Sequence, residues 1–90
     1  MYQRETTILN QTGLHARPAS IFVQSAKQYQ SKITIQKRST GASVDAKSII
    51  KVLSLSLTQG TEIVISADGA DETTAVDNLV TLISEGFGEL

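Results

Sequence analysis

The sequence predicts an α+β domain in which a four-stranded antiparallel sheet is covered on one face by three helices. Four segments alternate polar and apolar residues, as strands with one wet face do. Three further segments repeat apolar residues every three or four positions, as amphipathic helices do. The segments follow the order β-α-β-β-α-β-α, with no repeat or linker between them. We therefore expect a single two-layer, open-faced sandwich over residues 1–90.

An N-terminal strand is expected to lead into the first helix. Residues 2–9 alternate with period two, which predicts a strand. The turn signal Gln11-Thr12-Gly13 separates this strand from a helix predicted over residues 16–29. Pro18 is tolerated only in the first turn of a helix, so the helix is expected to begin next to His15.

A hairpin and a short helix are expected in the middle of the chain. A second strand begins at residues 33–35, and the polar stretch 37–41 turns it back into a third strand at 42–45. Ser48 is a preferred N-cap residue and is expected to begin a short helix. Gly60 lies in the turn that follows this helix. The apolar residues of the short helix are Ile49, Ile50, Val52 and Leu53.

A fourth strand and a third helix complete the predicted order. Residues 61–67 alternate around two isoleucines, and a turn at 68–71 leads into the last helix. Acidic residues at its start suit the positive end of the helix dipole, and Gly86 is suited to end it. The apolar face of this helix is expected to contain Ala75, Val76, Leu79, Leu82 and Ile83.

Composition excludes several functional classes. The formal net charge is −1 and Trp is absent, so we expect no nucleic-acid partner. The chain has no Cys and one His, which argues against disulfides and zinc, and we expect neither metal nor cofactor. No stretch approaches the roughly 18 apolar residues that cross a bilayer, and no signal-peptide pattern begins the chain. We expect a monomeric, cytoplasmic protein without membrane insertion.

The single histidine lies in a setting suited to phosphate. It belongs to the segment Gly13-Leu14-His15-Ala16-Arg17-Pro18, at the predicted start of the first helix. A helix start offers free backbone N–H groups and a positive dipole end, and Arg17 adds a planar cationic fork. Pro18 has no N–H, so the amides of Ala16 and Arg17 are the nearest donors. We expect His15 to accept a phosphoryl group, and residues Ala16, Arg17 and Pro18 to form the phosphate-binding segment.

The chemistry of histidine supports this expectation, although His15 could also be a helix cap or surface residue without a chemical role. Neutral histidine is well populated near pH 7, so one ring nitrogen can attack phosphorus while the other keeps its proton. A lone histidine beside a helix start is also often a mere cap or surface residue. The chain has neither a GxSxG motif nor a Walker-type glycine loop, which argues against a hydrolase and against ATP binding. A small phosphate-processing enzyme would need more cations than Arg17 alone.

Adjacent isoleucines indicate a docking surface for a partner protein. Ile49 and Ile50 follow one another, so a single helical stripe does not easily bury both. An apolar patch beside a reactive group is typical of a protein-binding site. The residues expected to share this surface are Ser20, Ile21, Ile49, Ile50 and Leu53. Ser48, at the start of the same short helix, is also a candidate for regulatory phosphorylation besides its role as a cap.

The chain contains the segments GLHARPAS, KSII, LTQG and ISADG. Together they resemble segments of the histidine-containing phosphocarrier (HPr) family of the bacterial phosphotransferase system. The segment GLHARPAS, residues 13–20, resembles the phosphorylation-site signature of that family. The segment KSII, residues 47–50, resembles its second signature, which opens the short helix. The segments LTQG at 57–60 and ISADG at 65–69 are also similar to family segments. The resemblance therefore covers nearly the whole chain.

The resemblance implies the same β-α-β-β-α-β-α sandwich and a carrier rather than an enzyme. It implies that enzyme I, charged by phosphoenolpyruvate, phosphorylates Nδ1 of His15, and that IIA proteins then receive the group for sugar uptake. Arg17 matches the active-site arginine of the family, and Ser48 matches its regulatory serine. A serine kinase/phosphorylase and transcriptional regulators are further partners that the resemblance implies.

Three features depart from many members of the family. The loop at residues 37–45 is longer, and Lys51 stands where many Gram-positive members have glycine, which bears on recognition by the serine kinase. The longer loop and the tail at 85–90 are similar to the nitrogen-related branch (NPr), which uses the same chemistry with different partners. That branch is one alternative function. A regulatory module that binds partners without phosphoryl transfer is another, although the presence of both His15 and Arg17 favours transfer.

Overall fold

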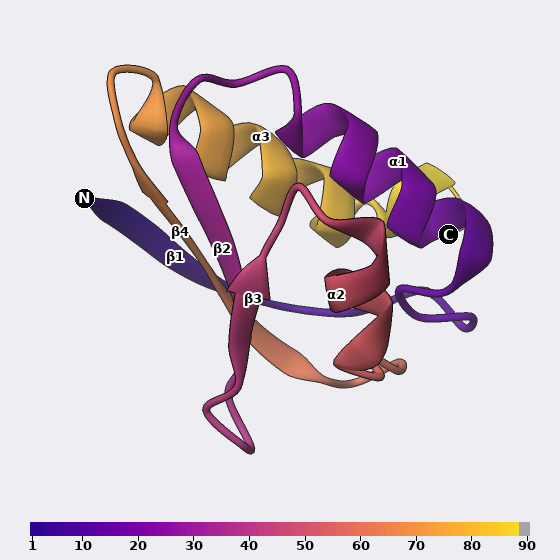
Figure 1. Cartoon of the computed structure of the whole chain (residues 1–90). Coiled ribbons are helices and arrows are strands. Elements are labelled where there is room, and N and C mark those ends of the chain that lie inside the picture. The colour runs from indigo at the N-terminus through magenta and orange to yellow at the C-terminus, as the bar shows by residue number, and fades with distance from the viewer. Residues whose placement is uncertain (89–90) are drawn as a thin grey trace.

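A four-stranded antiparallel sheet forms one layer of the molecule, and three α-helices form the other (Figure 1). This computed structural model describes residues 1–88, so the last two residues of the tail at 85–90 lie outside it. The strands are β1 (Tyr2–Thr7), β2 (Lys32–Lys37), β3 (Ser43–Asp45) and β4 (Glu62–Asp68). The helices are α1 (Ala16–Ala26), α2 (Ile49–Ser54) and α3 (Glu72–Ser84), followed by the 3₁₀ turn η1 (Gly86–Gly88). The predicted element order and the α+β open-faced sandwich are confirmed.

The strands lie in the order β1-β4-β2-β3, and every neighbouring pair is antiparallel. The last strand in the chain, β4, therefore lies between β1 and β2. Ile65 pairs with Arg4 on one side and with Ile35 on the other, which places it in the middle of the sheet. Alternation along β4 directs Ile63, Ile65 and Ala67 toward the helices, where all three are buried.

Apolar side chains from the inner face of the sheet pack against α1 and α3. Phe22 of α1 and Leu79 of α3 are fully buried, together with Ile33 and Ile35 of β2. Burying one such side chain contributes about 2 kcal/mol to stability. Figure 1 shows α1 and α3 lying along the same face of the sheet, with α2 beside them near β3. None of the helices within residues 1–88 is long and apolar enough to cross a bilayer.

Helix α1 ends at Ala26, before its predicted end at Tyr29. Groups from distant parts of the chain hold the backbone that follows. The Lys47 ammonium donates to the carbonyl of Tyr29 at 2.7 Å, and a carboxylate oxygen of Asp71 accepts from the amide of Gln30 at 2.9 Å. The spacing of apolar residues in the sequence predicts a helix as far as Tyr29. The helix ends earlier because these hydrogen bonds from distant residues hold the following backbone in another conformation.

Two other predicted details differ from the structure. Strand β1 ends at Thr7 rather than residue 9, because Ile8 pairs with a turn: its amide donates to Thr61 O at 3.0 Å, and its carbonyl accepts from Gly60 N at 2.7 Å. In α3, Leu82 is only half-buried, and Val80 takes its place in the core. The buried stripe of α3 is thus Ala75, Val76, Leu79, Val80 and Ile83.

Asp71 joins the start of α3 to the turn after α1. One of its carboxylate oxygens accepts from the Ser31 amide at 2.9 Å and from the Ser31 hydroxyl, while the other accepts from Gln30. The hydrogen bond from the Ser31 hydroxyl, followed by those from the backbone amides, holds the pKa of Asp71 below its ordinary value of 3.8. The charged form of Asp71 therefore stabilises the folded chain.

An Asp71→Asn variant is expected to melt several degrees below the wild type at pH 7, because it loses the charge that these donors favour. A depressed pKa contributes stability above the unfolded value, and this stability is lost as pH falls through the folded value. The gap in melting temperature should therefore narrow when both proteins are scanned below pH 4. The exposed Asp68 offers a matched Asp→Asn control, and an equal effect there would contradict the role of Asp71.

Candidate functional site

His15 is the N-cap residue of α1, and its side chain is free of the capping role. Its backbone is extended, with φ −130° and ψ 147°, and its side chain makes no cap hydrogen bond. The imidazole is exposed to solvent. A histidine retained only as a cap would bond to a first-turn amide. The imidazole instead lies exposed, without a cap hydrogen bond, at the positive end of a helix.

The loop before His15 is fastened to the segment that follows α2. The Leu14 amide donates to the carbonyl of Leu57 at 2.8 Å, and the buried Asn10 side chain donates to the carbonyl of Gly13 at 2.9 Å. Gly13 has φ +66°, and a Cβ there would lie 2.4 Å from Leu57 O. Both the conformation and the close approach require glycine.

Sequence reasoning missed Asn10 as the residue that orders this loop. It follows directly after the strand predicted over residues 2–9, and in the sequence it resembles one more polar residue of a turn. The asparagine before the turn at residues 11–13 could have indicated this role, because Asn side chains commonly form hydrogen bonds with backbone groups a few residues further on.

Ala16 adopts a left-handed conformation, with φ +45°, between His15 and Arg17. A non-glycine residue in this region costs of order 1–3 kcal/mol and persists only where its surroundings impose it. Nothing in the sequence indicates this conformation, because alanine is an ordinary helix former. The backbone of Ala16, next to His15, is therefore strained at a position where the first residue of a helix normally has right-handed helical angles.

The three residues of the expected phosphate-binding segment differ in their surroundings. Arg17 is exposed, and it takes part in none of the ion pairs found within residues 1–88, so its guanidinium remains available for an anion. Ala16 and Arg17 lie in the first turn, where amides have no partner within the helix. Pro18 is buried on the core side of α1, so its contribution is the fixed backbone of the first turn.

A shallow hollow of about 260 Å³ lies beside His15. Its wall comes from the loop before α1 and from the end of α2 with the segment that follows. Leucine and hydroxyl side chains make up most of its lining, and Ser56 there has φ +54°. The lining residues are Thr12, Leu14, His15, Leu53, Ser56, Leu57 and Thr58. The hollow is small, so it suits a side chain or a phosphoryl group better than a large ligand.

The residues expected to form the docking surface lie on α1 and α2, which pack against one another. Ile50 is 78% exposed, and Ile49 and Leu53 are 37% and 39% exposed. On α1, Ser20 is exposed and Ile21 is half-buried. The short helix thus presents a cluster of large apolar side chains to solvent, close to the hollow that Leu53 shares with His15. Such a cluster is unusual on a surface that has no partner.

Ser48 is the N-cap of α2, with φ −112°, and its hydroxyl accepts a hydrogen bond from the Lys51 amide at 3.4 Å. The predicted cap is confirmed. The neighbouring Lys47 ammonium is engaged with the Tyr29 carbonyl, while Lys51 is exposed.

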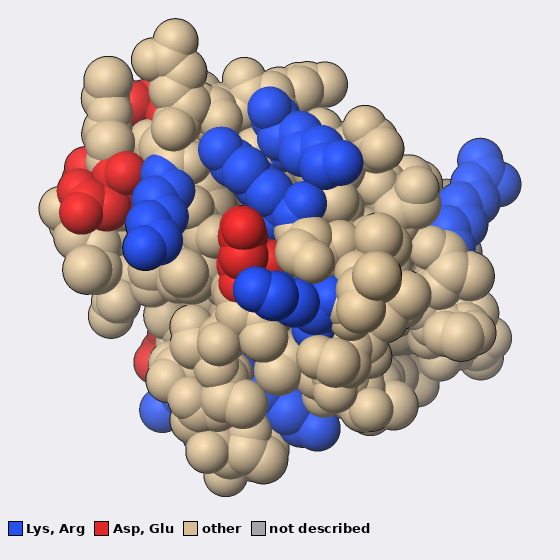
Figure 2. Space-filling view, viewed as in Figure 1, with Lys and Arg blue, Asp and Glu red and all other residues tan. Residues whose placement is uncertain are grey.

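Basic side chains predominate on the face of the molecule that carries these helices. Figure 2 shows several Lys and Arg over and beside the part of the view where Figure 1 places α1 and α2, with an acidic side chain among them near the centre. The first turn of α1 contains no acidic residue. Within residues 1–88, no group of three or more His, Cys, Asp or Glu side chains is placed to hold a metal ion. The arrangement favours an anion at His15 and a partner with an acidic surface.

Comparison with known proteins indicates one family of phosphocarrier proteins. Residues 2–85 match the family model described as the PTS HPr component phosphorylation site. The phosphocarrier protein HPr of Haemophilus influenzae is 51% identical over 83 residues, which cover 92% of this chain and 95% of that protein.

Solved structures extend the comparison to the fold. A crystal structure of HPr-C-His from Thermoanaerobacter tengcongensis superposes with a TM-score of 0.95 at 44% identity, covering 100% of this chain and 99% of that one. An HPr dimer from the same organism has a TM-score of 0.78 at 45% identity, covering 99% of this chain and 100% of that one.

An open-faced sandwich that presents an exposed histidine and arginine at a helix start defines the class of small histidine phosphocarriers. Within this class, the chain belongs to the HPr family, because the family model spans most of its length and the Haemophilus relative is more than half identical. Membership of the HPr family supports the role of a carrier protein rather than that of a catalyst.

Proposed function

We propose that the chain accepts a phosphoryl group from enzyme I on Nδ1 of His15 and donates it to IIA proteins during sugar uptake. The observation that supports this most strongly is the exposed imidazole at the start of α1, free of any cap hydrogen bond, beside the exposed Arg17. The deciding experiment is incubation with phosphoenolpyruvate and either the carbohydrate-branch or the nitrogen-branch enzyme I. Labelling by the carbohydrate-branch enzyme is expected.

The proposed transfer assigns a simple role to each group. The neutral imidazole forms a bond from Nδ1 to phosphorus as the bond from phosphorus to the donor breaks. The second ring nitrogen keeps its proton. The amides at the start of α1 and the guanidinium of Arg17 stabilise the oxygens of the moving group, which carry negative charge throughout. The reverse sequence then passes the group to a IIA protein, and no cofactor is needed.

The exposed surface of α1 and α2 is the proposed docking site for both partners. Its residues are Ser20, Ile21, Ile49, Ile50 and Leu53. An apolar patch rimmed by basic side chains suits brief encounters with an acidic protein, because charge steers approach while a small contact area permits rapid release. A carrier that serves two partners in turn needs such short-lived complexes.

An Arg17→Ala variant is expected to lower kcat/KM for His15 phosphorylation about tenfold, because a charge-assisted contact to the moving group is lost in a solvent-exposed site. Arg17→Lys should recover part of this loss, since it keeps the charge without the planar fork. The melting temperature should stay unchanged, as Arg17 is exposed. Arg4 in β1 provides a matched Arg→Ala control, and wild-type rates in both Arg17 variants would exclude the role.

A Ser48→Asp variant is expected to slow His15 labelling severalfold while leaving the melting temperature unchanged. Aspartate is itself a good N-cap, and its charge suits the start of α2, but it lies next to the apolar docking residues. Ser48→Ala is the companion control, which removes the cap and costs about 1 kcal/mol without adding charge. Labelling of the Asp variant at the wild-type rate would leave Ser48 with its capping role alone.

The nitrogen-related branch is the second candidate, because the loop at residues 37–45 and the tail at 85–90 resemble that branch in sequence. Charging by the nitrogen-branch enzyme I alone would replace the first proposal with this one. A chain that binds enzyme I but takes no phosphate would instead be a regulatory module.

A further inference from the structure

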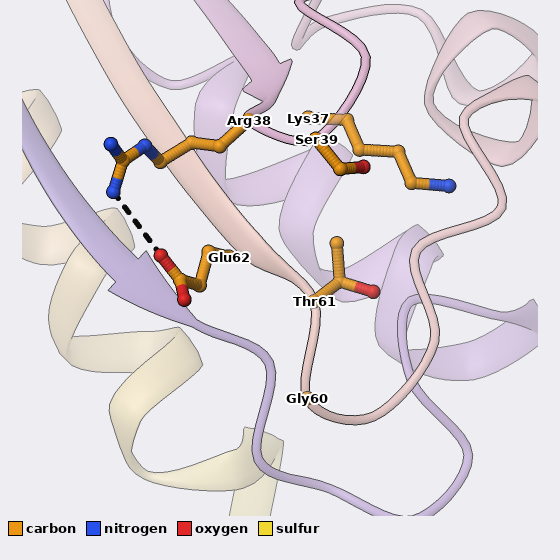
Figure 3. A pocket seen from close by; sticks show the side chains of 6 residues that line it. All are labelled: Lys37, Arg38, Ser39, Gly60, Thr61 and Glu62. Atoms are coloured by element: carbon orange, nitrogen blue, oxygen red, sulfur yellow. Dashed lines mark hydrogen bonds and ion pairs between the residues drawn. The ribbon is translucent and has the colours of Figure 1, made fainter.

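Lys37, the last residue of β2, reaches across to the end of α2. Its ammonium donates to the carbonyl of Leu55 at 3.2 Å and approaches that of Ser56 at 3.5 Å. Figure 3 shows that Lys37 and its neighbour Arg38 extend in opposite directions, with Arg38 turned toward Glu62, to which it is bonded at 3.1 Å. Lys37 is therefore engaged with the segment after α2, and it takes no part in the ion pairs found within residues 1–88.

The positive charge of Lys37 stabilises the C-terminal end of α2. The helix has only six residues, too few for stability on its own, and its last carbonyls carry the negative end of the helix dipole. Strand β2 pairs with β4 on one side and β3 on the other, so the backbone that carries Lys37 is fixed in the sheet. Lys37 thus ties a short helix to the hydrogen-bonded sheet.

The same contact bears on the wall of the hollow beside His15. Ser56 has the left-handed φ of +54°, which a serine keeps only when its surroundings impose it. Its amide donates to Leu53 O at 3.2 Å, and its carbonyl accepts from Thr58 N at 3.1 Å and lies near Lys37. Both Leu53 and Ser56 line the hollow with His15. Lys37 is therefore one of the groups that hold this wall in place.

We infer that Lys37 is a positioning residue for docking: it keeps the exposed residues of α2 and the wall at Ser56 ready for a partner. The inference rests on the proposed function, in which enzyme I docks on α2. Lys37 is not among the residues that line the hollow beside His15. Its loss therefore weakens docking, because the partner must order a frayed helix end, while the chemistry at His15 proceeds as before.

The kinetic test measures phosphorylation by enzyme I with phosphoenolpyruvate over a range of carrier concentrations. Lys37→Met should raise KM for the carrier about fivefold and leave kcat unchanged, as expected when one hydrogen bond from a charged group is lost. Lys37→Arg should restore most of the loss. Lys32→Met, at the other end of the same strand, removes the same charge and should match the wild type. Ile50→Asp, on the docking surface itself, should raise KM further.

A second measurement tests the positioning without any partner. Amide hydrogen exchange of Leu55 and Ser56, whose N–H groups close the last turn after α2, should be about tenfold faster in Lys37→Met than in Lys32→Met. Exchange elsewhere in the sheet should not change.

Each outcome decides one of the two claims. An unlabelled wild-type chain overturns the proposed function, and exchange alone then decides whether Lys37 holds the end of α2. With labelling intact, a wild-type KM in Lys37→Met overturns the inference, and so does unchanged exchange at Leu55 and Ser56. If the KM of Ile50→Asp equals that of the wild type, α2 is not part of the docking surface. The inference about Lys37 is then overturned as well.

Discussion

A His15→Ala variant is expected to take up no acid-labile phosphate from enzyme I and phosphoenolpyruvate, whereas the wild type takes up one phosphoryl group per chain. The substitution removes the only imidazole in the sequence, and no other side chain of the site forms a comparable bond between nitrogen and phosphorus. Intact-mass measurement before and after mild acid treatment distinguishes phosphohistidine from the acid-stable phosphate that Ser48 would carry.

The fold of this variant should be preserved, which makes the result easy to interpret. His15 is exposed, and its side chain makes no cap hydrogen bond, so alanine removes no internal contact of that kind. The melting temperature should stay close to that of the wild type. Undiminished labelling of His15→Ala would show that another residue is the acceptor.

A Gly13→Ala variant is expected to lose about 3 kcal/mol of stability and to melt roughly 15 °C lower, since strain and overpacking add together. Gly13 has φ +66°, and an added Cβ would stand 2.4 Å from Leu57 O and 2.9 Å from Thr58 Cα. Both neighbours are backbone atoms, which cannot rotate away. The loop must move to relieve the clash, so His15 shifts and phosphorylation slows as well. Thermal unfolding and the labelling assay together measure both effects.

Gly41 offers the matched control for this prediction. It has a similar φ of +76°, but an added Cβ would meet nothing within 4 Å. Gly41→Ala should therefore cost only the conformational part, about 1 kcal/mol. Equal losses at the two glycines would show that the contact with Leu57 has no role in holding the His15 loop.

The sheet and the helices could be predicted because their patterns are local. Alternation around Ile63 and Ile65, and the three- and four-residue spacing around Phe22, report directly which side of each element is buried. The end of α1 could not be predicted in the same way. It depends on Lys47 and Asp71, which lie far along the chain and carry no signal near Tyr29.

The position of His15 at a helix start was predictable, because Pro18 restricts where the helix begins. The surroundings of His15 were not. Asn10 orders the preceding loop, and the left-handed backbone of Ala16 runs against the ordinary preference of alanine for the right-handed helix. The contact from Lys37 depends on sheet topology, since it joins the end of one strand to a helix that follows much later.

The place of β4 in the sheet also determines when the chain can fold during synthesis. As β4 is the only strand that pairs with β1 within residues 1–88, β1 leaves the ribosome long before its neighbour exists. A nascent chain that ends before Glu62 has a hairpin and two helices but no continuous sheet to pack them on. Folding of this domain therefore waits until most of the chain has emerged, as expected for a topology with many distant contacts.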